Sequence, residues 1–287
     1  MKKLLRAASG DPERLVALLV ARLALSEGDA ERLVERGAVE VDGKRVSEDR
    51  DVRIGARVTA FLPDAAEPTV VPLVLAYKDV QVLVIDKPAG LRSQAVRGDS
   101  WDTLVAQVHR ELDPQASLLH RLDRETSGLV VLPRTDQARR ALQASLDAGQ
   151  IDRRYVARVQ GRLEGPRTID LPIARDPRDA RRRIGAPTGE AAVSHVELLS
   201  SDGETSCVRL TLEHGRTHQL RVHLASIGHP VLGDALYGGP AAARLCLHAD
   251  ELTFPHPRSE TPRRVRSAVP PALGIPNDVL RALHATT

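Results

Sequence analysis

A single carboxylate stands between two arginines in HRLDRETSGLVVL, residues 120–132. Asp123 follows Arg121 by two residues and directly precedes Arg124, and an apolar run begins at Gly128. An acid between two guanidinium groups is either a turn residue with ion-pair partners or a reactive carboxylate held ionised in a site for a polyanion. On the pattern alone, a turn-capping aspartate is the commoner outcome.

A second group of reactive side chains is EHGRTHQLRVH, residues 213–223, with three histidines. On a helix that begins near Thr217, His218 and His223 would lie about 140° apart around the axis, so they diverge. We therefore favour separate structural or RNA-facing histidines over a metal site. The same helix would place His218 and Arg221 on one side. Arg221 would then either face a cleft or be a surface arginine with no functional role.

Two further features allow both a structural and a functional interpretation. Tyr155, in RRYVARV, is one of 3 tyrosines, and a strand tyrosine more often belongs to the core. The segment ARDPRDARRRI is rich in arginines, which would either contact phosphates or form a solvated charged loop. These are Arg175, Arg178, Arg181, Arg182 and Arg183.

The motifs that the sequence lacks narrow the chemistry. It has no Gly-rich phosphate loop ending in Gly-Lys-Ser/Thr, no GxGxxG, no GxSxG and no HExxH. Nucleotide hydrolysis, dinucleotide redox chemistry, serine hydrolysis and zinc proteolysis therefore lack their usual local machinery. Cys207 and Cys246 stand outside any CxxC pair, so neither a disulfide framework nor a cysteine zinc site is suggested. Chemistry without a cofactor is favoured.

The composition describes a globular chain with a weakly positive charge balance. Lys and Arg total 41 against 38 Asp and Glu, a net charge of +3, which does not by itself separate a nucleic-acid binder from an Arg-rich enzyme. With 42% apolar residues among 287, one large domain and a small one are expected. The apolar run near the N-terminus is interrupted by Arg22 and lacks a cleavage site, so we expect a cytoplasmic protein without a membrane span.

The elements that must position the reactive residues follow from periodicity. Residues 13–62 predict two short helices, the second capped by Asp29, and then strands that include a hairpin around the Asp-Gly turn of AVEVDGKRV. The stretch PDAAEPTVVP indicates a linker. We predict a small domain at residues 1–65, a linker at 66–72 and a larger domain at 73–287.

In the larger domain, LVLAYKDVQVLVIDKPAGL, RRYVARVQG and TSCVRLTLE predict strands. SLLHRL and GLVVL are expected to be strands that flank Asp123 and hold it at or beside their connection. Helices are predicted near WDTLVAQVHREL, capped by Asp102, at TDQARRALQASLDAGQ, capped by Thr135, and from Thr217. This order lacks regular βαβ alternation and favours an α+β fold with a mixed, mainly antiparallel sheet and flanking helices.

Together these segments resemble the RluA-like family of ribosomal and transfer RNA pseudouridine synthases. HRLDRETSGLVVL resembles the active-site motif of that family, which reads His-Arg-Leu-Asp, a basic residue, an acidic residue and Thr-Ser-Gly before an apolar strand. GRTHQLRVHLASIGHPVLGDALYG, residues 215–238, resembles a second long block. DKPAGL, RRYVARVQG and LHADELTFPHP fall in the expected order, and the similarity runs from about Leu73 to Pro257.

The resemblance implies isomerisation of specific uridines to pseudouridine in structured RNA, with ribosomal RNA favoured over transfer RNA. This reaction breaks the glycosidic bond and rejoins uracil through a ring carbon, without ATP, metal or cofactor, on a base that has left its stack. By resemblance, Asp123 is the essential carboxylate, Arg221 keeps it ionised, and Tyr155 stacks under the flipped base. Covalent attack by Asp123 and removal of a sugar proton both remain open.

The resemblance also implies RNA contacts. Arg121 would fill the place of the flipped base, and Arg124, Arg216 and His218 would contact the RNA. Residues 13–62 are similar to an alpha-L RNA-binding motif, although SEGDAERL has acidic residues where relatives have basic ones, which would repel phosphate. We expect a monomer with RNA as its partner. The alternatives are a non-catalytic RNA-binding protein on the same scaffold and a metal-dependent hydrolase that uses the histidines.

Overall fold

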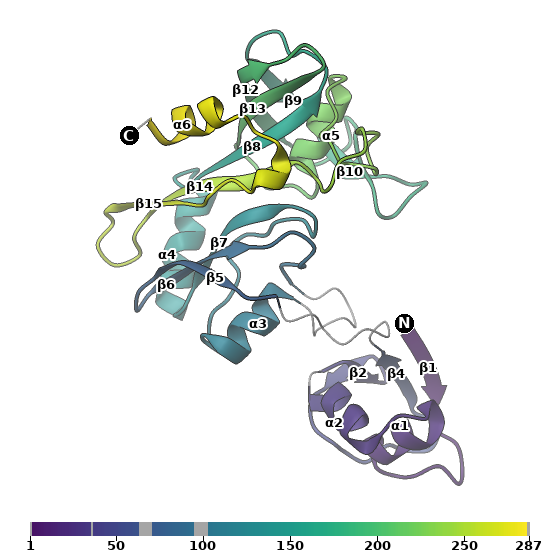
Figure 1. Ribbon diagram of the computed structural model, residues 1–287. Coiled ribbons are helices and arrows are strands. Elements are labelled where there is room, and N and C mark those ends of the chain that lie inside the picture. The colour runs from purple at the N-terminus through teal and green to yellow at the C-terminus, as the bar shows by residue number, and fades with distance from the viewer. Residues whose placement is uncertain (1, 36, 63–70, 95–102, 286–287) are drawn as a thin grey trace. The chain divides into compact units, whose positions relative to one another are not determined.

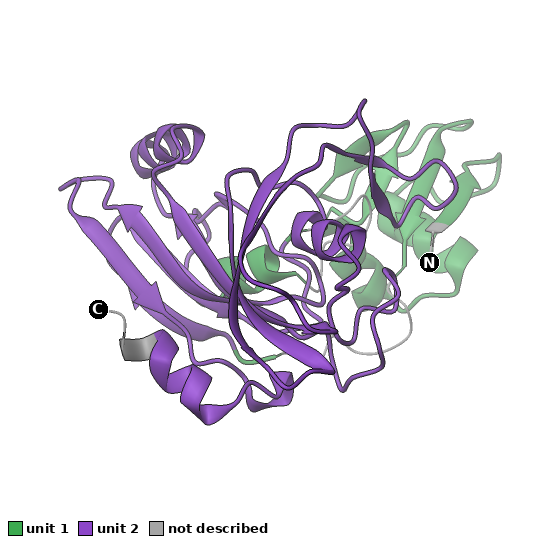
Figure 2. Ribbon diagram, turned by 90° about the horizontal axis from the view of Figure 1, so that it is seen from above, with its two compact units in different colours: residues 1–72, 94–112 green, residues 73–93, 113–287 purple. Residues whose placement is uncertain are grey.

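The computed structural model describes residues 2–35, 37–62, 71–94 and 103–285. The chain divides into two compact units, one made of Met1–Pro72 and Gln94–Leu112 and the other of Leu73–Ser93 and Asp113–Thr287 (Figure 2). The division at Leu73 coincides with the end of the predicted linker, most of which lies outside the described residues. Residues 94–112, which the boundaries predicted from sequence place in the larger domain, group with the first unit.

The first unit contains a small antiparallel sheet and short helices. Its elements are β1 (Lys2–Arg6), α1 (Leu15–Leu23), α2 (Glu27–Glu35), β2 (Val39–Val41), β3 (Lys44–Val46), β4 (Arg57–Phe61) and α3 (Leu104–Glu111), and the strand order is β1-β4-β2-β3. The predicted Asp-Gly turn joins β2 to β3, with Asp42 and Gly43 at positive φ. Leu18 of α1, Leu33 of α2 and Val58 of β4 belong to one buried apolar cluster.

Two predicted helix caps of this unit are wrong. Ser26 caps α2 in place of Asp29, since its Oγ accepts the backbone N–H of Asp29 at 3.2 Å. Thr103 caps α3, because its Oγ1 accepts the N–H of Ala106 at 3.2 Å, whereas the predicted Asp102 lies outside the described residues. In both cases a neighbouring hydroxyl residue is an equally good cap by type, and the backbone geometry decides between them.

The second unit is built on a nine-stranded sheet with the order β5-β6-β7-β14-β8-β13-β12-β9, to which β15 adds by pairing with β14 (Figure 1). The strands are β5 (Val74–Lys78), β6 (Val82–Lys87), β7 (Ser127–Pro133), β8 (Asp152–Gln160), β9 (Arg167–Asp170), β12 (Val193–Ser201), β13 (Thr205–Leu212), β14 (Leu247–Pro255) and β15 (Pro262–Arg266). A separate hairpin contains β10 (Ile173–Arg175) and β11 (Arg183–Gly185). The β7–β14 pair is parallel and the other pairs of the nine-stranded sheet are antiparallel, which confirms the predicted mixed, mainly antiparallel α+β fold.

Helices flank this sheet. They are α4 (Asp136–Asp147), α5 (Gln219–Ser226), the 3-10 turn η1 (Pro271–Leu273) and α6 (Asn277–Ala285). Thr135 caps α4 as predicted, with its Oγ1 accepting the N–H of Ala138 at 3.1 Å. The predicted start of α5 at Thr217 is wrong, because His218 is the N-cap residue and has a left-handed backbone with φ 59°. In the described parts of the chain, no helix has the length and hydropathy needed to cross a membrane.

The segment before β7 differs from the prediction. SLLHRL forms no strand, since it makes only isolated backbone bonds, such as Ser117 N–H to Pro133 O at 3.0 Å and Leu119 N–H to Val131 O at 3.3 Å. Asp123 therefore lies in a loop that leads into β7. At the start of that strand, Gly128 has φ 118°, and a Cβ there would lie 2.2 Å from the carbonyl oxygen of Ala249 in β14. Only glycine allows this close parallel pairing.

Candidate active site

The loop that carries Asp123 is fastened to the segment that follows β6. Lys87 is fully buried, and its Nζ donates hydrogen bonds to the carbonyl oxygens of Pro88, Leu91 and Arg124 at 2.9, 2.8 and 3.3 Å. Burial lowers the pKa of Lys87 to about 7, and the negative charge of Asp123 acts in the opposite direction. Lys87 thus connects the two loops through their backbones.

Further contacts fix the backbone on both sides of Asp123. Ser93 Oγ donates to the carbonyl of Leu122 at 2.7 Å and accepts the N–H of Leu122 at 3.0 Å. The N–H of Gly90 donates to the carbonyl of Arg124 at 2.7 Å, and Arg124 Nε donates to the carbonyl of Gly90 at 3.0 Å. The Asp123 side chain itself stays 17% exposed, so a rigid backbone presents an accessible carboxylate.

Arg221 approaches this carboxylate from α5. Its Nη1 lies 3.5 Å from Asp123 Oδ2, while its Nε and Nη2 each donate a 2.7 Å hydrogen bond to the carboxylate of Asp234. The side chains of Arg221 and Asp234 are 5% and 1% exposed. Burial lowers the pKa of the Arg221 guanidinium. The hydrogen bonds to Asp234 and the negative charge of Asp234 have the larger effect, so the net pKa is raised. The arginine is therefore a fixed cation beside Asp123.

Tyr237 connects this pair to a histidine. The guanidinium carbon of Arg221 lies 5.1 Å from the centroid of the Tyr237 ring, which is within cation–π range. The Tyr237 hydroxyl accepts the backbone N–H of Arg183 at 2.8 Å and lies 2.8 Å from His218 Nδ1. Because burial lowers the pKa of His218, we assign it as neutral, with Tyr237 donating to Nδ1 and the ring proton on Nε2.

Tyr155 lies on β8 and shares a pocket with the two charged residues. Its side chain is 5% exposed, and burial raises the pKa of its hydroxyl. The pocket has a volume of about 50 Å³ and is lined by Asp123, Tyr155 and Arg221 together with Arg121, Arg153, Arg216 and His218 and several apolar residues. The structure thus brings together the three residues to which the resemblance gave catalytic roles.

The predicted RNA-contacting residues lie in different surroundings. Arg121 is exposed, and its Nη2 donates to Thr217 Oγ1 at 2.9 Å. Arg216 is half-buried, paired with Glu190 at 2.7 Å and bonded to the carbonyl of Ala191. Arg121, Arg216 and His218 line the pocket, whereas the exposed Arg124 does not.

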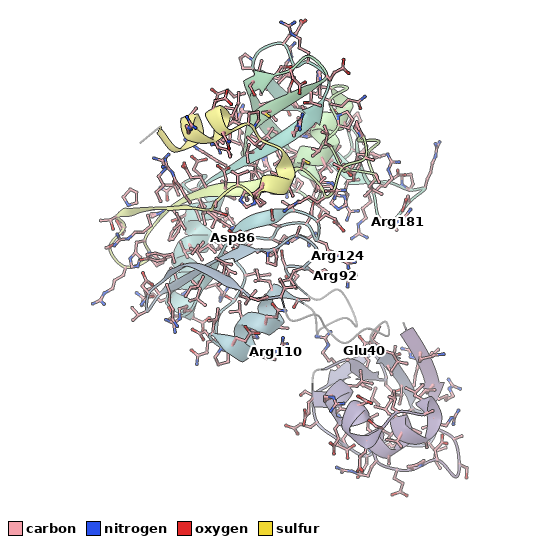
Figure 3. The ribbon with its side chains drawn as sticks, viewed as in Figure 1. Glu40, Asp86, Arg92, Arg110, Arg124 and Arg181 are labelled. Atoms are coloured by element: carbon pink, nitrogen blue, oxygen red, sulfur yellow. The ribbon has the colours of Figure 1, made fainter. Side chains whose placement is uncertain are left out.

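The arginine-rich segment forms the β10–β11 hairpin and its connection. Figure 3 shows Arg181 on the projecting connection, where it is exposed and paired with Asp179 at 2.7 Å. Arg182 lies with its guanidinium carbon 5.4 Å from the ring centroid of Tyr237. Arg182 is thus linked to the pocket through Tyr237, whereas the adjacent Arg181 faces solvent.

The three histidines of residues 213–223 point to different partners. His214 Nδ1 accepts the backbone N–H of Val193 at 3.2 Å. His223 is fully buried, with Nδ1 2.9 Å from Ser194 Oγ and Nε2 2.9 Å from the carbonyl of Leu171. Within the described residues, no group of three His, Cys, Asp or Glu side chains is arranged to hold a metal ion. The prediction that these histidines diverge is confirmed.

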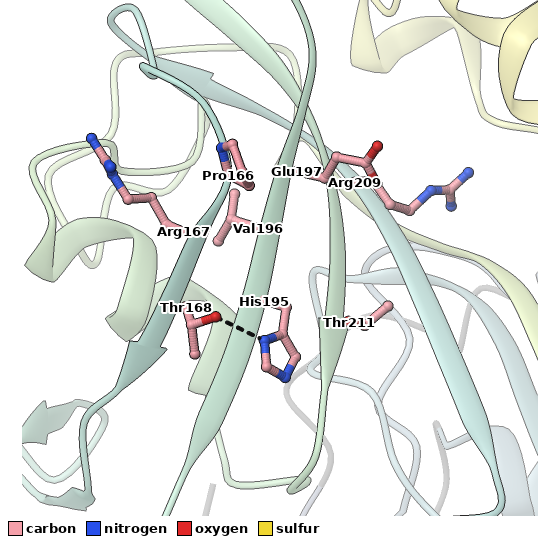
Figure 4. A pocket seen from close by; sticks show the side chains of 8 residues that line it. All are labelled: Pro166, Arg167, Thr168, His195, Val196, Glu197, Arg209 and Thr211. Carbon is pink, nitrogen blue, oxygen red and sulfur yellow. Dashed lines mark hydrogen bonds between the residues drawn. The ribbon is translucent and has the colours of Figure 1, made fainter.

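A larger hollow, of about 390 Å³, is lined by residues at or beside β9, β12 and β13 (Figure 4). Its lining includes His195 and Arg209, and Figure 4 shows His195 Nδ1 bonded to Thr168, a contact of 3.1 Å. Tyr155 is paired with Leu210, so Arg209, one residue earlier, points to the opposite face. None of the predicted site residues lines this hollow.

Lys87, Asp234 and Tyr237, which hold the site together, were not predicted from the sequence. Asp234 and Tyr237 lie within the second long block, but charge and type alone do not show which acid anchors Arg221. Lys87 lies in DKPAGL, where a lysine beside Pro88 reads as part of a surface loop. Its place directly after the apolar run Val82–Ile85 and Asp86 was the available signal that this lysine belongs to a buried strand.

The comparisons with known proteins agree with this architecture. Residues 81–226 match the family model described as RNA pseudouridylate synthase. "Ribosomal large subunit pseudouridine synthase D" of Xanthomonas campestris is 41% identical over 241 residues, which cover 77% of this chain and 71% of the relative. "Dual-specificity RNA pseudouridine synthase RluA" of Yersinia pestis is 36% identical over 198 residues, covering 66% and 96%.

The solved structure of the human protein "RNA Pseudouridylate Synthase Domain Containing 1" superposes with a TM-score of 0.63 at 25% identity, covering 77% of this chain and 98% of that one. The fold and the matched segment define an RNA-modifying isomerase. The chain belongs to the RluA-like family of RNA pseudouridine synthases.

Proposed function

We propose that this enzyme isomerises specific uridines of large-subunit ribosomal RNA, with Asp123 as the reacting carboxylate on a flipped-out nucleotide. The observation that carries the proposal is the 3.5 Å contact between Asp123 Oδ2 and Arg221 Nη1, at a pocket that Tyr155 also lines. The choice of RNA is supported by the name of the Xanthomonas relative, a synthase of the large ribosomal subunit.

The geometry suits a carboxylate that must be charged and still free to react. Asp234 takes the two short hydrogen bonds of Arg221, so Asp123 receives the positive field through a single long contact. Both covalent attack on the sugar and removal of a sugar proton need an ionised oxygen with an available lone pair. An arrangement of this kind supports either route.

Tyr155 and Arg121 take complementary roles in the proposal. Tyr155 is held in the sheet and kept neutral by burial, so its ring would stack under the flipped base and its hydroxyl would be available for proton transfer. Arg121 is exposed beside the pocket and is held by Thr217, so it would occupy the space that the base leaves in the RNA.

The remaining RNA contacts are assigned to Arg124, Arg216 and His218. Arg124 is exposed next to Asp123, Arg216 lies at the rim with one carboxylate partner, and His218 offers its Nε2 N–H. In the same proposal, residues 1–65 form an alpha-L type RNA-binding domain, residues 66–72 a linker and residues 73–287 the catalytic domain.

The decisive assay follows release of tritium from RNA that carries 5-tritiated uridine, because rejoining uracil through C5 expels the hydrogen there. We expect release by the wild type and none by Asp123→Asn. Glu125→Gln is the matched control, since this exposed acid lies in the same loop. Equal release by Asp123→Asn would refute the role of Asp123, and RNA binding without release by the wild type would favour the non-catalytic alternative.

The choice of RNA is tested separately. Pseudouridines are mapped in ribosomal and transfer RNA from cells with and without this protein. Sites that disappear from large-subunit ribosomal RNA would support the proposed substrate. Sites that disappear only from transfer RNA would replace it with the other candidate.

A further inference from the structure

Among the residues that the structure describes, one cation of the pocket has no hydrogen-bond or ion-pair partner. Arg153 lies on β8, two residues before Tyr155, and lines the same pocket, yet it is only 8% exposed. Within the described residues its guanidinium makes no hydrogen bond and no ion pair, and its Nε is buried without an acceptor. Burying an unpaired charge lowers the stability of the folded protein. We therefore expect the Arg153 guanidinium to bind an anionic group of the substrate.

The local structure directs this guanidinium into the pocket. Residues two apart on a strand share a face, so Arg153 and Tyr155 lie on the same side of β8. Gly215 gives the side chain room, because a Cβ there would lie 2.9 Å from Arg153 Nη1. Burial raises the pKa of Tyr155, and the positive charge of Arg153 opposes that effect, so the two groups lie within electrostatic reach.

Two groups of an RNA substrate could supply the negative charge that Arg153 binds: a backbone phosphate, or the uracil base once its glycosidic bond is broken. Phosphates remain at the mouth of a site that accepts a flipped nucleotide, where the exposed Arg121 is placed. Arg153 is buried beside the tyrosine proposed to stack under the base. Its position therefore fits the base better than the backbone.

We infer that Arg153 is a catalytic residue that stabilises uracil as an anion after the glycosidic bond breaks, an inference that rests on the proposed function. When the C1′–N1 bond breaks, its electron pair goes to the uracil ring and spreads over N1, O2 and O4. The C5–C1′ bond then forms, the proton on C5 is lost and N1 gains a proton, so the overall change is an isomerisation. A largely buried guanidinium stabilises the charge that develops on the base in these steps.

The test compares Arg153→Met with Arg154→Met, a matched control whose arginine points to the opposite face and pairs with Asp152 at 2.8 Å. For Arg153→Met we expect kcat for tritium release to fall on the order of a hundredfold, with little change in KM. We also expect no loss of resistance to urea, because the variant removes an unpaired buried charge. Arg153→Lys should recover part of the activity.

Other outcomes would overturn the inference. If Arg153→Met lowers RNA affinity and also reduces the slope of log K against log salt concentration by about 1, Arg153 contacts a phosphate instead. A clear loss of stability in Arg153→Met, without recovery of activity in Arg153→Lys, would identify a structural residue. Failure of the wild type to release tritium would refute the proposed function itself, whereas release by the wild type and by both methionine variants would refute only the role of Arg153.

Discussion

Asp234 accepts two 2.7 Å hydrogen bonds, from Nε and Nη2 of Arg221, and the remaining nitrogen of this guanidinium, Nη1, lies 3.5 Å from Asp123 Oδ2. The buried acid thus fixes the arginine, and the partly exposed acid only receives its charge. Two carboxylates around one guanidinium have different environments and, in our proposal, different roles.

Asp234→Ala should separate anchoring from chemistry. Removing one member of a buried ion pair leaves an uncompensated charge, so we expect the free energy of unfolding to fall by about 3–5 kcal/mol, with loss of tritium release at temperatures where the variant is folded. Urea denaturation measures the first effect. Asp136→Ala, which removes an exposed acid from a pair with Arg139, should change stability by less than about 1 kcal/mol. Equal losses in both variants would contradict the anchoring role.

Tyr155→Phe tests the hydroxyl separately from the ring. The phenyl ring keeps the apolar packing and can still stack under a base, so we expect unchanged RNA affinity and a near-normal free energy of unfolding. If the hydroxyl assists proton transfer, the rate of tritium release should fall by about 10²-fold or more. Tyr155→Leu, which removes the ring, should weaken RNA binding as well. A fully active Tyr155→Phe would limit the residue to stacking.

His248 of β14 should make the protein sensitive to acid. It is 1% exposed, between Ser127 and Ser267, at 2.7 and 3.0 Å, and burial lowers its pKa from 6.5 to about 3. The unfolded chain therefore binds more protons than the folded one between these values, so stability falls as the pH decreases from 6.5 toward 3, by at most about 1.4 kcal/mol per pH unit. Urea denaturation at pH 6.5 and pH 4.5 should show a smaller difference in His248→Gln than in the wild type. An identical pH dependence in both proteins would contradict this assignment.

The acidic face of α2 should weaken RNA binding by the first unit. Glu27 and Glu31 are exposed on this helix, at the place where the resemblance leads one to expect basic residues. If this unit contacts RNA, Glu27→Lys with Glu31→Lys should tighten binding at low salt and steepen its salt dependence. Filter binding over a salt series measures both. Unchanged affinity and slope would indicate that this helix does not face the RNA.

Local signals in the sequence predicted much of the fold. The strand over RRYVARVQG, the Thr135 cap and the Asp-Gly hairpin all depend on neighbouring residues, and the structure confirms them. SLLHRL was predicted wrongly as a strand because its apolar residues pack beside β7 through isolated bonds, without forming a ladder. Composition cannot separate these two arrangements, since both bury the same side chains.

The residues of the candidate site could be predicted only where they belong to a motif of the family. The contact between Asp123 and Arg221 joins residues 98 positions apart, and the anchor at Asp234 depends on where the turn after α5 places its side chain. Arg153 shows the limit most clearly, because Arg153 and Arg154 are identical in type and adjacent in sequence. The pleat of β8 alone decides which of them lines the pocket and which pairs with Asp152.

The parallel β7–β14 pair joins one part of the sheet, built from β5, β6 and β7, to the part that contains β8 and β13. Asp123 comes from the chain just before β7, whereas Tyr155 and Arg221 come from segments associated with the other part. The reaction centre that we propose therefore forms only once β7 has paired with β14 at Gly128. During refolding, recovery of catalysis should lag behind recovery of the helical signal, since catalysis needs this long-range pairing whereas helices form from local contacts.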